Sequence, residues 1–272
     1  MELFVFALIL ALLAGLSTTI GCIFAILVKK PSPAFLSIIM GFSAGVMILV
    51  SFVELLIEAI NSNGFIIGLF FFFVGLFIML LFDITITHKY EFEDTIEKFV
   101  NRNNHNPPNR HHRRRHRHRR EVNLEKTSLL VFLGIFIHNI PEGIATFVGT
   151  IKSVELGIIL AVAIALHNIP EGIAVASPIY ASTESRKKAF LWSFLSGISE
   201  FLGALIFGLI FFPFINDYFL GAMLAIVAGL MVYISLDELL PVSHSLGKEH
   251  LSIIGLIMGM LVMSLSLALF LK

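Results

Sequence analysis

Apolar residues fill long stretches of the chain, and polar residues gather where these stretches end. Eight runs are long enough to cross a hydrocarbon core of ~30 Å, which takes roughly 20 residues as an α-helix. The runs cover residues 3–28, 34–60, 64–82, 127–149, 154–177, 189–212, 218–240 and 251–271. This pattern predicts an all-α membrane protein with eight transmembrane helices.

Composition strengthens that prediction. The chain is 57% hydrophobic and only 14% charged, and 27 of its 272 residues are Phe, which excludes an ordinary soluble globular domain. No basic segment precedes the first run, which is longer than a signal-peptide core, so we expect a true first span. The single cysteine, Cys22, excludes an intramolecular disulfide and a cysteine-based metal cluster.

Basic residues are distributed very unevenly. Eleven of the 19 Lys and Arg lie between Lys89 and Lys126. Basic residues that flank spans stay on the cytoplasmic side, and with eight spans all but two of them, Lys152 and Lys272, fall on one side. We therefore expect a multi-pass protein of the plasma membrane, with both termini outside and the 83–126 loop in the cytoplasm.

The loop carries the sequence RNNHNPPNRHHRRRHRHRR at residues 102–120. It lacks apolar periodicity, so we expect disorder. Its histidines suggest metal capture, but seven Arg between Arg110 and Arg120 repel divalent cations. A role in orientation or in binding anionic lipid is favoured over metal sensing, and no nucleic-acid partner is expected.

Two segments far apart in the chain resemble each other. FSAGVMILVSFVELL at residues 42–56 aligns with IVAGLMVYISLDELL at residues 226–240, and their spans cross the membrane in opposite directions. This predicts an inverted repeat in a 3+2+3 arrangement, which is common in secondary transporters. The expected regions are helices one to three (1–82), the Arg/His-rich loop (83–126), metal-binding helices four and five (127–177) and helices six to eight (178–272).

A second repeat carries the chemistry. HNIPEGIA occurs at residues 138–145 and, 29 residues later, at residues 167–174. Residues four apart share a helix face, so His138 and Glu142 converge, as do His167 and Glu171. Asn139 and Asn168 lie about 100° around the helix and three residues before the same glutamates. Each glutamate can therefore serve two neighbouring sites.

A third carboxylate, Glu200, lies another 29 residues along, and spans four to six contain no Lys or Arg. An ionised glutamate within a bilayer costs roughly 3 kcal/mol unless it is compensated. Imidazole, carboxylate and amide oxygen together suit a divalent cation such as Zn²⁺ or Fe²⁺. Single polar residues in membranes more often form interhelical hydrogen bonds, but a duplicated His–Glu motif favours metal binding.

Other acidic residues are open to two interpretations. Glu54 near the outer end of span two, and Asp237 and Glu238 near the inner end of span seven, could line a pathway. They could equally be interfacial charges at helix ends.

With HNIPEG in two consecutive spans, Glu200 in the next and a His-bearing loop before them, the chain resembles the ZIP family of metal transporters, in particular its bacterial branch. The resemblance implies a two-metal site bridged by Glu142 and Glu171. One ion, often assigned as iron, would add Asn139, Asn168 and Glu200. The other, often assigned as zinc, would add His167, with His138 available.

The resulting hypothesis is uptake of divalent metal into the cytoplasm by alternating access. Zn²⁺ and Fe²⁺ are the expected substrates, with Mn²⁺, Co²⁺ and Cd²⁺ as further candidates. No catalytic residues or resident cofactor are expected, membrane lipid is the expected surrounding, and a homodimer is compatible with the sequence.

Two other functions use the same residues. Intramembrane zinc proteases carry HExxH with the Glu as general base, whereas this chain has HNxxE and every glutamate would be a ligand. A membrane receptor that responds to metal without transport stays open.

Overall fold

The computed structural model describes residues 2–28, 32–85, 124–246 and 249–270, and within these residues it contains helices and no strand. The α-helices are α1 (Glu2–Val28), α2 (Pro33–Val50), α3 (Leu56–Asn63), α4 (Phe65–Thr85), α6 (Leu124–Lys152), α7 (Val154–Thr183), α8 (Arg186–Phe211), α9 (Asp217–Ile234), α10 (Leu240–Ser245) and α11 (Glu249–Phe270). Short π-helical turns, η1 (Ser51–Leu55) and η4 (Ser235–Leu239), join α2 to α3 and α9 to α10. A 3₁₀ turn, η3 (Phe212–Phe214), follows α8.

The eight predicted spans correspond to these helices. Seven described helical segments are long and apolar enough to cross a membrane, counting α2 through α3 and α9 through α10 as one each. The 29-residue α6 is the eighth. The all-α membrane fold is therefore confirmed. The apolar span in α7 covers Val154–Ser177, as predicted, although the helix continues to Thr183, whereas the α9–α10 span continues to Ser245, past its predicted end at residue 240. The 83–126 loop falls mostly outside the described residues, between Thr85 and Leu124.

Side-chain caps explain where several helices begin. Ser32, Ser153, Ser185 and Asn216 have extended backbone, and each side chain accepts a hydrogen bond from an N–H of the first turn. Such caps satisfy donors that have no partner inside the helix. Because these polar residues separate the apolar runs, the chain reverses there and places successive helices antiparallel.

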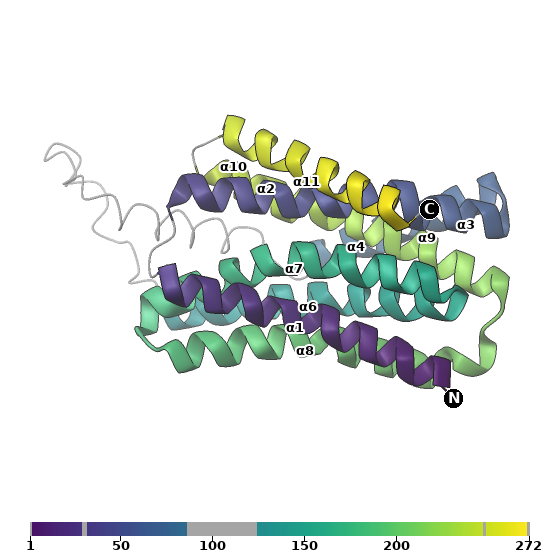
Figure 1. Cartoon of the computed structure of the whole chain (residues 1–272), viewed down its shortest axis with the longest axis horizontal. Helices are drawn as coiled ribbons and strands as arrows, with labels where there is room; N and C mark the ends of the chain where they lie inside the picture. Colours follow the sequence, from purple (N-terminus) through teal and green to yellow (C-terminus); the bar gives the residue numbers. More distant parts are fainter. Residues whose placement is uncertain (1, 29–31, 86–123, 247–248, 271–272) are drawn as a thin grey trace, which may run out of the picture.

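The helices form two bundles that lie against each other (Figure 1). In the first, which we call the motif bundle, each of α1, α6, α7 and α8 contacts the other three. The second, the flanking bundle, contains α2, α3, α4, α9, α10 and α11. The bundles meet chiefly where α2 packs on α7 and α9 packs on α6. Both described ends of the chain lie toward the same end of the molecule, at the right of Figure 1.

The inverted repeat is visible in local detail. The two π-helical turns occupy equivalent positions in the repeated segments, one beginning at Ser51 and the other at Ser235. Both serines are buried, and each hydroxyl donates to a carbonyl four residues earlier, on Met47 and Met231, at 2.7 Å. Because a π-helical turn inserts one residue into the helical ladder, the repeat preserves a specific irregularity as well as the apolar pattern.

Helix packing obeys the same repeat. Gly45 in α2 lies against the carbonyl of Leu256 in α11, and the equivalent Gly229 in α9 lies against the carbonyl of Phe72 in α4. A side chain at either glycine would meet backbone atoms of the neighbouring helix. The pair α2–α11 is therefore the structural equivalent of α9–α4, with α6 and α7 as the central pair.

Candidate metal centre

The residues predicted to bind metal lie in the middle of the motif bundle. Six come from α6 and α7, and the seventh comes from α8. All have side chains at most 3% exposed: His138, Asn139, Glu142, His167, Asn168, Glu171 and Glu200. Helix α6 continues through Pro141, so His138 and Glu142 keep the spacing that places them on one face.

Two histidines and two glutamates converge between α6 and α7. His138, Glu142 and Glu171 each offer a ligand atom within 4.8 Å of the others. The His138 Nε2 atom lies 3.4 Å from Glu142 Oε1 and 3.3 Å from Glu171 Oε1. His167 Nε2 lies 2.9 Å from Glu142 Oε1. The structure thus brings the two halves of the repeated motif together across one helix interface.

The asparagines are oriented by backbone carbonyls of α8 and α1, the other two helices of the motif bundle. Asn139 Nδ2 donates to the Ser196 carbonyl of α8 at 2.9 Å, and Asn168 Nδ2 donates to the Ala14 carbonyl of α1 at 3.1 Å. Both amide oxygens are buried without a hydrogen-bond partner. With the amide nitrogens bound to carbonyls, these oxygens are available as metal ligands.

The same two carbonyls also accept hydroxyl groups. Ser17 Oγ donates to the Ala14 carbonyl at 2.6 Å, and Ser199 Oγ donates to the Ser196 carbonyl at 2.5 Å. Each carbonyl therefore receives one amide and one hydroxyl. α1 and α8 thus hold the two asparagines in the same way, as expected if they are equivalent helices of the two repeats.

Glu200 reaches the centre from α8. Its carboxylate accepts a hydrogen bond from Asn168 Nδ2, which links α8 to α7. Helix α8 packs closely on α6, because Gly143 of α6 lies against the carbonyl of Glu200. A Cβ at position 143 would collide with the backbone of α8. The glycine of the motif thus sets the approach of the third carboxylate.

The electrostatics of this cluster fit a cation. Glu142 Oε2, both Glu171 oxygens and Glu200 Oε2 are buried without a hydrogen-bond partner, although buried polar atoms are normally paired. In the described α6, α7 and α8, Lys and Arg occur only in a first or last turn. Three carboxylates with imidazole and amide oxygens form a donor set suited to divalent metal.

The structure adds Glu238, a residue outside the predicted ligand set. Glu238 Oε2 lies 3.6 Å from His138 Nδ1, and its side chain is 37% exposed. It belongs to η4, whose irregular turn changes the direction of side chains relative to a continuous α-helix. The buried centre therefore has an acidic, partly exposed neighbour in the flanking bundle.

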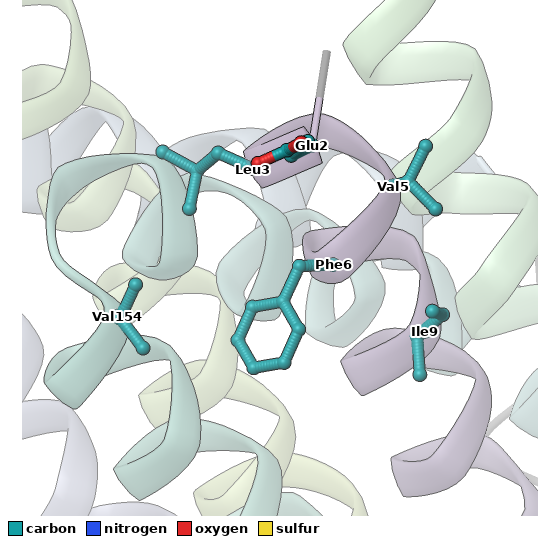
Figure 2. Close-up of a pocket in the computed structure, with 6 residues that line it drawn as sticks. All are labelled: Glu2, Leu3, Val5, Phe6, Ile9 and Val154. Carbon is teal, nitrogen blue, oxygen red and sulfur yellow. The ribbon is translucent and has the colours of Figure 1, made fainter.

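A pocket elsewhere has different chemistry. It has a volume of about 730 Å³ and lies between the first residues of α1 and the start of α7 (Figure 2). Five of its lining residues are apolar, and Glu2 is the sixth. One carboxylate without nitrogen ligands does not make a site for a transition metal, so the pocket is separate from the motif centre.

Comparison with known proteins gives consistent relatives. The model of the family described as ZIP Zinc transporter matches residues 86–267. A Zinc transporter ZupT from Corynebacterium aurimucosum is 42% identical, with 97% of each chain covered. Proteins of the same name from Clostridium perfringens (42% identity, 97% of this chain and 95% of the relative) and Chlorobaculum parvum (43% identity, 98% of each) are similar over nearly their full lengths.

Proposed function

Since this chain belongs to the ZIP zinc transporter family, as its family match and full-length relatives show, we propose that it imports divalent metal, zinc above all, into the cytoplasm. One observation supports the proposal above all: the two HNIPEGIA motifs and Glu200 supply buried carboxylate and amide oxygens that lack hydrogen-bond partners, beside two buried histidines. The relatives are named as transporters, which supports a function other than catalysis.

The proposed centre holds two cations. Glu142, His167 and Glu171 bind Zn²⁺, with His138 close enough to join them. Asn139, Asn168 and Glu200 bind a second ion, Fe²⁺ in this proposal, and both motif glutamates bridge. The short distances among the His and Glu side chains support the first set, and the Asn168–Glu200 hydrogen bond supports the second. Mn²⁺, Co²⁺ and Cd²⁺ are further candidate substrates.

The position of the centre among helices of an inverted repeat supports transport by alternating access. The ligands belong to the motif bundle, and α2 and α9 of the flanking bundle pack against the two helices, α7 and α6, that carry most of them. Glu238, beside His138 and partly exposed, is the proposed first station after release. Oxygen and nitrogen ligands exchange more readily than a closed four-cysteine site, which is built to retain metal.

The proposed orientation places both termini outside and the Arg/His-rich loop in the cytoplasm. The shared position of the two described chain ends supports a common side for the termini (Figure 1). Exposed apolar side chains on α4 and α11, such as Phe73 and Leu265, support lipid contact. A homodimer stays a prediction that measurement of mass in detergent would decide.

Uptake into liposomes that contain the purified protein tests the function. We expect Zn²⁺ to accumulate with the wild type and not with Glu142→Ala or Glu171→Ala. Glu155→Ala is the matched control, since Glu155 is an exposed glutamate of α7 outside the centre, and it should transport normally. Uptake that survives both motif substitutions would refute the site. Metal binding without flux would favour the receptor, and peptide cleavage without flux would favour the hydrolase.

A further inference from the structure

The equivalence of α1 and α8 assigns a counterpart to Glu200. Gly15 of α1 and Gly197 of α8 lie against each other's carbonyls. The Ala14 carbonyl with Ser17 in α1 matches the Ser196 carbonyl with Ser199 in α8. Counting one residue onward from each serine, the residue of α1 that corresponds to Glu200 is Thr18.

The backbone contacts of Thr18 support the correspondence. The Thr18 carbonyl lies against Gly172 of the second motif, as the Glu200 carbonyl lies against Gly143 of the first. Thr18 also follows Ala14 by one helical turn, so it shares the face whose carbonyl binds Asn168. The Thr18 Cβ lies beside Gly197 of α8, as the Glu200 Cβ lies beside Gly15 of α1. From this correspondence we infer that the Thr18 side chain faces the asparagine side of the centre.

The hydroxyl of Thr18 is buried and has no hydrogen-bond partner. A buried threonine in a helix usually donates to the carbonyl four residues earlier, as Thr150 does to Thr146. For Thr18 that carbonyl belongs to Ala14, and it already accepts Ser17 Oγ and Asn168 Nδ2. Since a carbonyl oxygen has two lone pairs, the usual partner is occupied.

We propose that the Thr18 hydroxyl oxygen is a further ligand of the metal centre and that it determines selectivity. It adds a neutral oxygen on the α1 side, where the equivalent position in α8 supplies a carboxylate. Zn²⁺ is satisfied by four ligands, whereas oxygen-preferring cations such as Mn²⁺ take six. Thr18 therefore favours the cations with the larger coordination shell. This inference rests on the proposed function, because it extends the same centre.

Mn²⁺ binding to the purified full-length chain tests the proposal without requiring flux. The free-ion EPR signal reports Mn²⁺ affinity, and Zn²⁺ affinity is measured by competition. We expect Thr18→Val to weaken Mn²⁺ binding roughly tenfold and to change Zn²⁺ binding less than twofold. Thr18→Ser, which keeps the hydroxyl, should bind Mn²⁺ as tightly as the wild type. Thr19→Val is the matched control, since Thr19 is also buried and unpartnered but points to another face.

The outcomes separate the possibilities. Equal Mn²⁺ affinity in the wild type and in Thr18→Val would overturn the assignment, as would a wild type that does not bind Mn²⁺. The assignment would also fail if Thr18→Val lost Mn²⁺ and Zn²⁺ affinity equally, or if Thr18→Val and Thr19→Val lost the same Mn²⁺ affinity. If Thr18→Val loses Mn²⁺ selectively while the wild type shows no Zn²⁺ flux in liposomes, the ligand assignment stands and the transport proposal fails.

Discussion

The two asparagines of this centre are oriented by backbone carbonyls. The Ala14 and Ser196 carbonyls each hold an asparagine nitrogen and a serine hydroxyl, which leaves the amide oxygens for metal. Groups that position ligands commonly affect metal affinity by 10- to 100-fold. Glu200 contributes both a negative charge and a hydrogen bond to Asn168, and a substitution that removes only the charge can separate these two contributions.

Replacing Glu200 by Gln tests its charge. The Gln side chain has nearly the same shape and retains an oxygen that accepts from Asn168 Nδ2, but it lacks the negative charge. We expect Fe²⁺ affinity to fall by about 10- to 100-fold, with a smaller effect on Zn²⁺, which is held by His167 and the motif glutamates. Competition binding of the two ions measures both effects. Equal losses for both ions would contradict two distinguishable positions.

At the scale of helices, close packing at the motif glycines places the ligands. Gly143 meets the backbone of Glu200, so Gly143→Ala must push α6 away from α8. Overpacking of this kind costs roughly 1–3 kcal/mol, and we expect lower thermal stability together with weaker metal binding. Gly149→Ala in the same helix is the control, because there the nearest atom is the Cδ1 end of the Leu160 side chain, which can move aside, and little change in metal binding is expected. Comparable losses in both variants would argue against a specific α6–α8 contact.

The sequence predicts the helices well, because apolar runs are local properties. Four-residue spacing likewise predicts that His and Glu of each motif share a helix face, whereas their role as metal ligands stays a prediction. The sequence does not predict that Glu238 approaches His138 at 3.6 Å, since the two residues belong to different bundles and a contact between distant segments leaves no local signal in the sequence. Nor does it indicate the roles of Ala14 and Ser196, whose carbonyls leave no mark in the choice of side chain. Ends of helices are also imprecise, because α7 continues past its apolar run to Thr183 and the α9–α10 segment continues to Ser245.

At the scale of the molecule, the carboxylates of the centre oppose folding when no metal is bound, because buried like charges repel. A cation that binds only the folded state stabilises it by about 2.7 kcal/mol at a concentration ~100 times its Kd. We expect Zn²⁺ to raise the midpoint of thermal unfolding in detergent and a chelator to reverse the rise. In Glu142→Gln, which loses a bridging charge, the rise should be much smaller. Identical unfolding of chelator-treated and Zn²⁺-loaded wild type would contradict a folded-state metal centre.

The two bundles are joined at one end by Lys152, the last residue of α6. Its Nζ atom lies 3.1 Å from Asp217 Oδ1 at the start of α9 and 3.8 Å from Glu58 Oε1 in α3. If the bundles separate at this end to admit metal, these ion pairs must break. A partly exposed ion pair contributes at most ~1 kcal/mol, so its loss should raise the open population by up to about fivefold.

Lys152→Met removes the charge and retains the apolar stem. To measure opening, Thr146→Cys is introduced in a Cys22→Ala background, because Thr146 is buried in α6 between Glu142 and Lys152. We expect an impermeant thiol reagent added outside to label Cys at this position up to about fivefold faster in Lys152→Met. Lys152→Arg keeps the positive charge and should label at the original rate. Because labelling needs only opening, an unchanged rate in Lys152→Met would mean that these ion pairs do not hold the bundles together during access, whatever the effect on metal uptake.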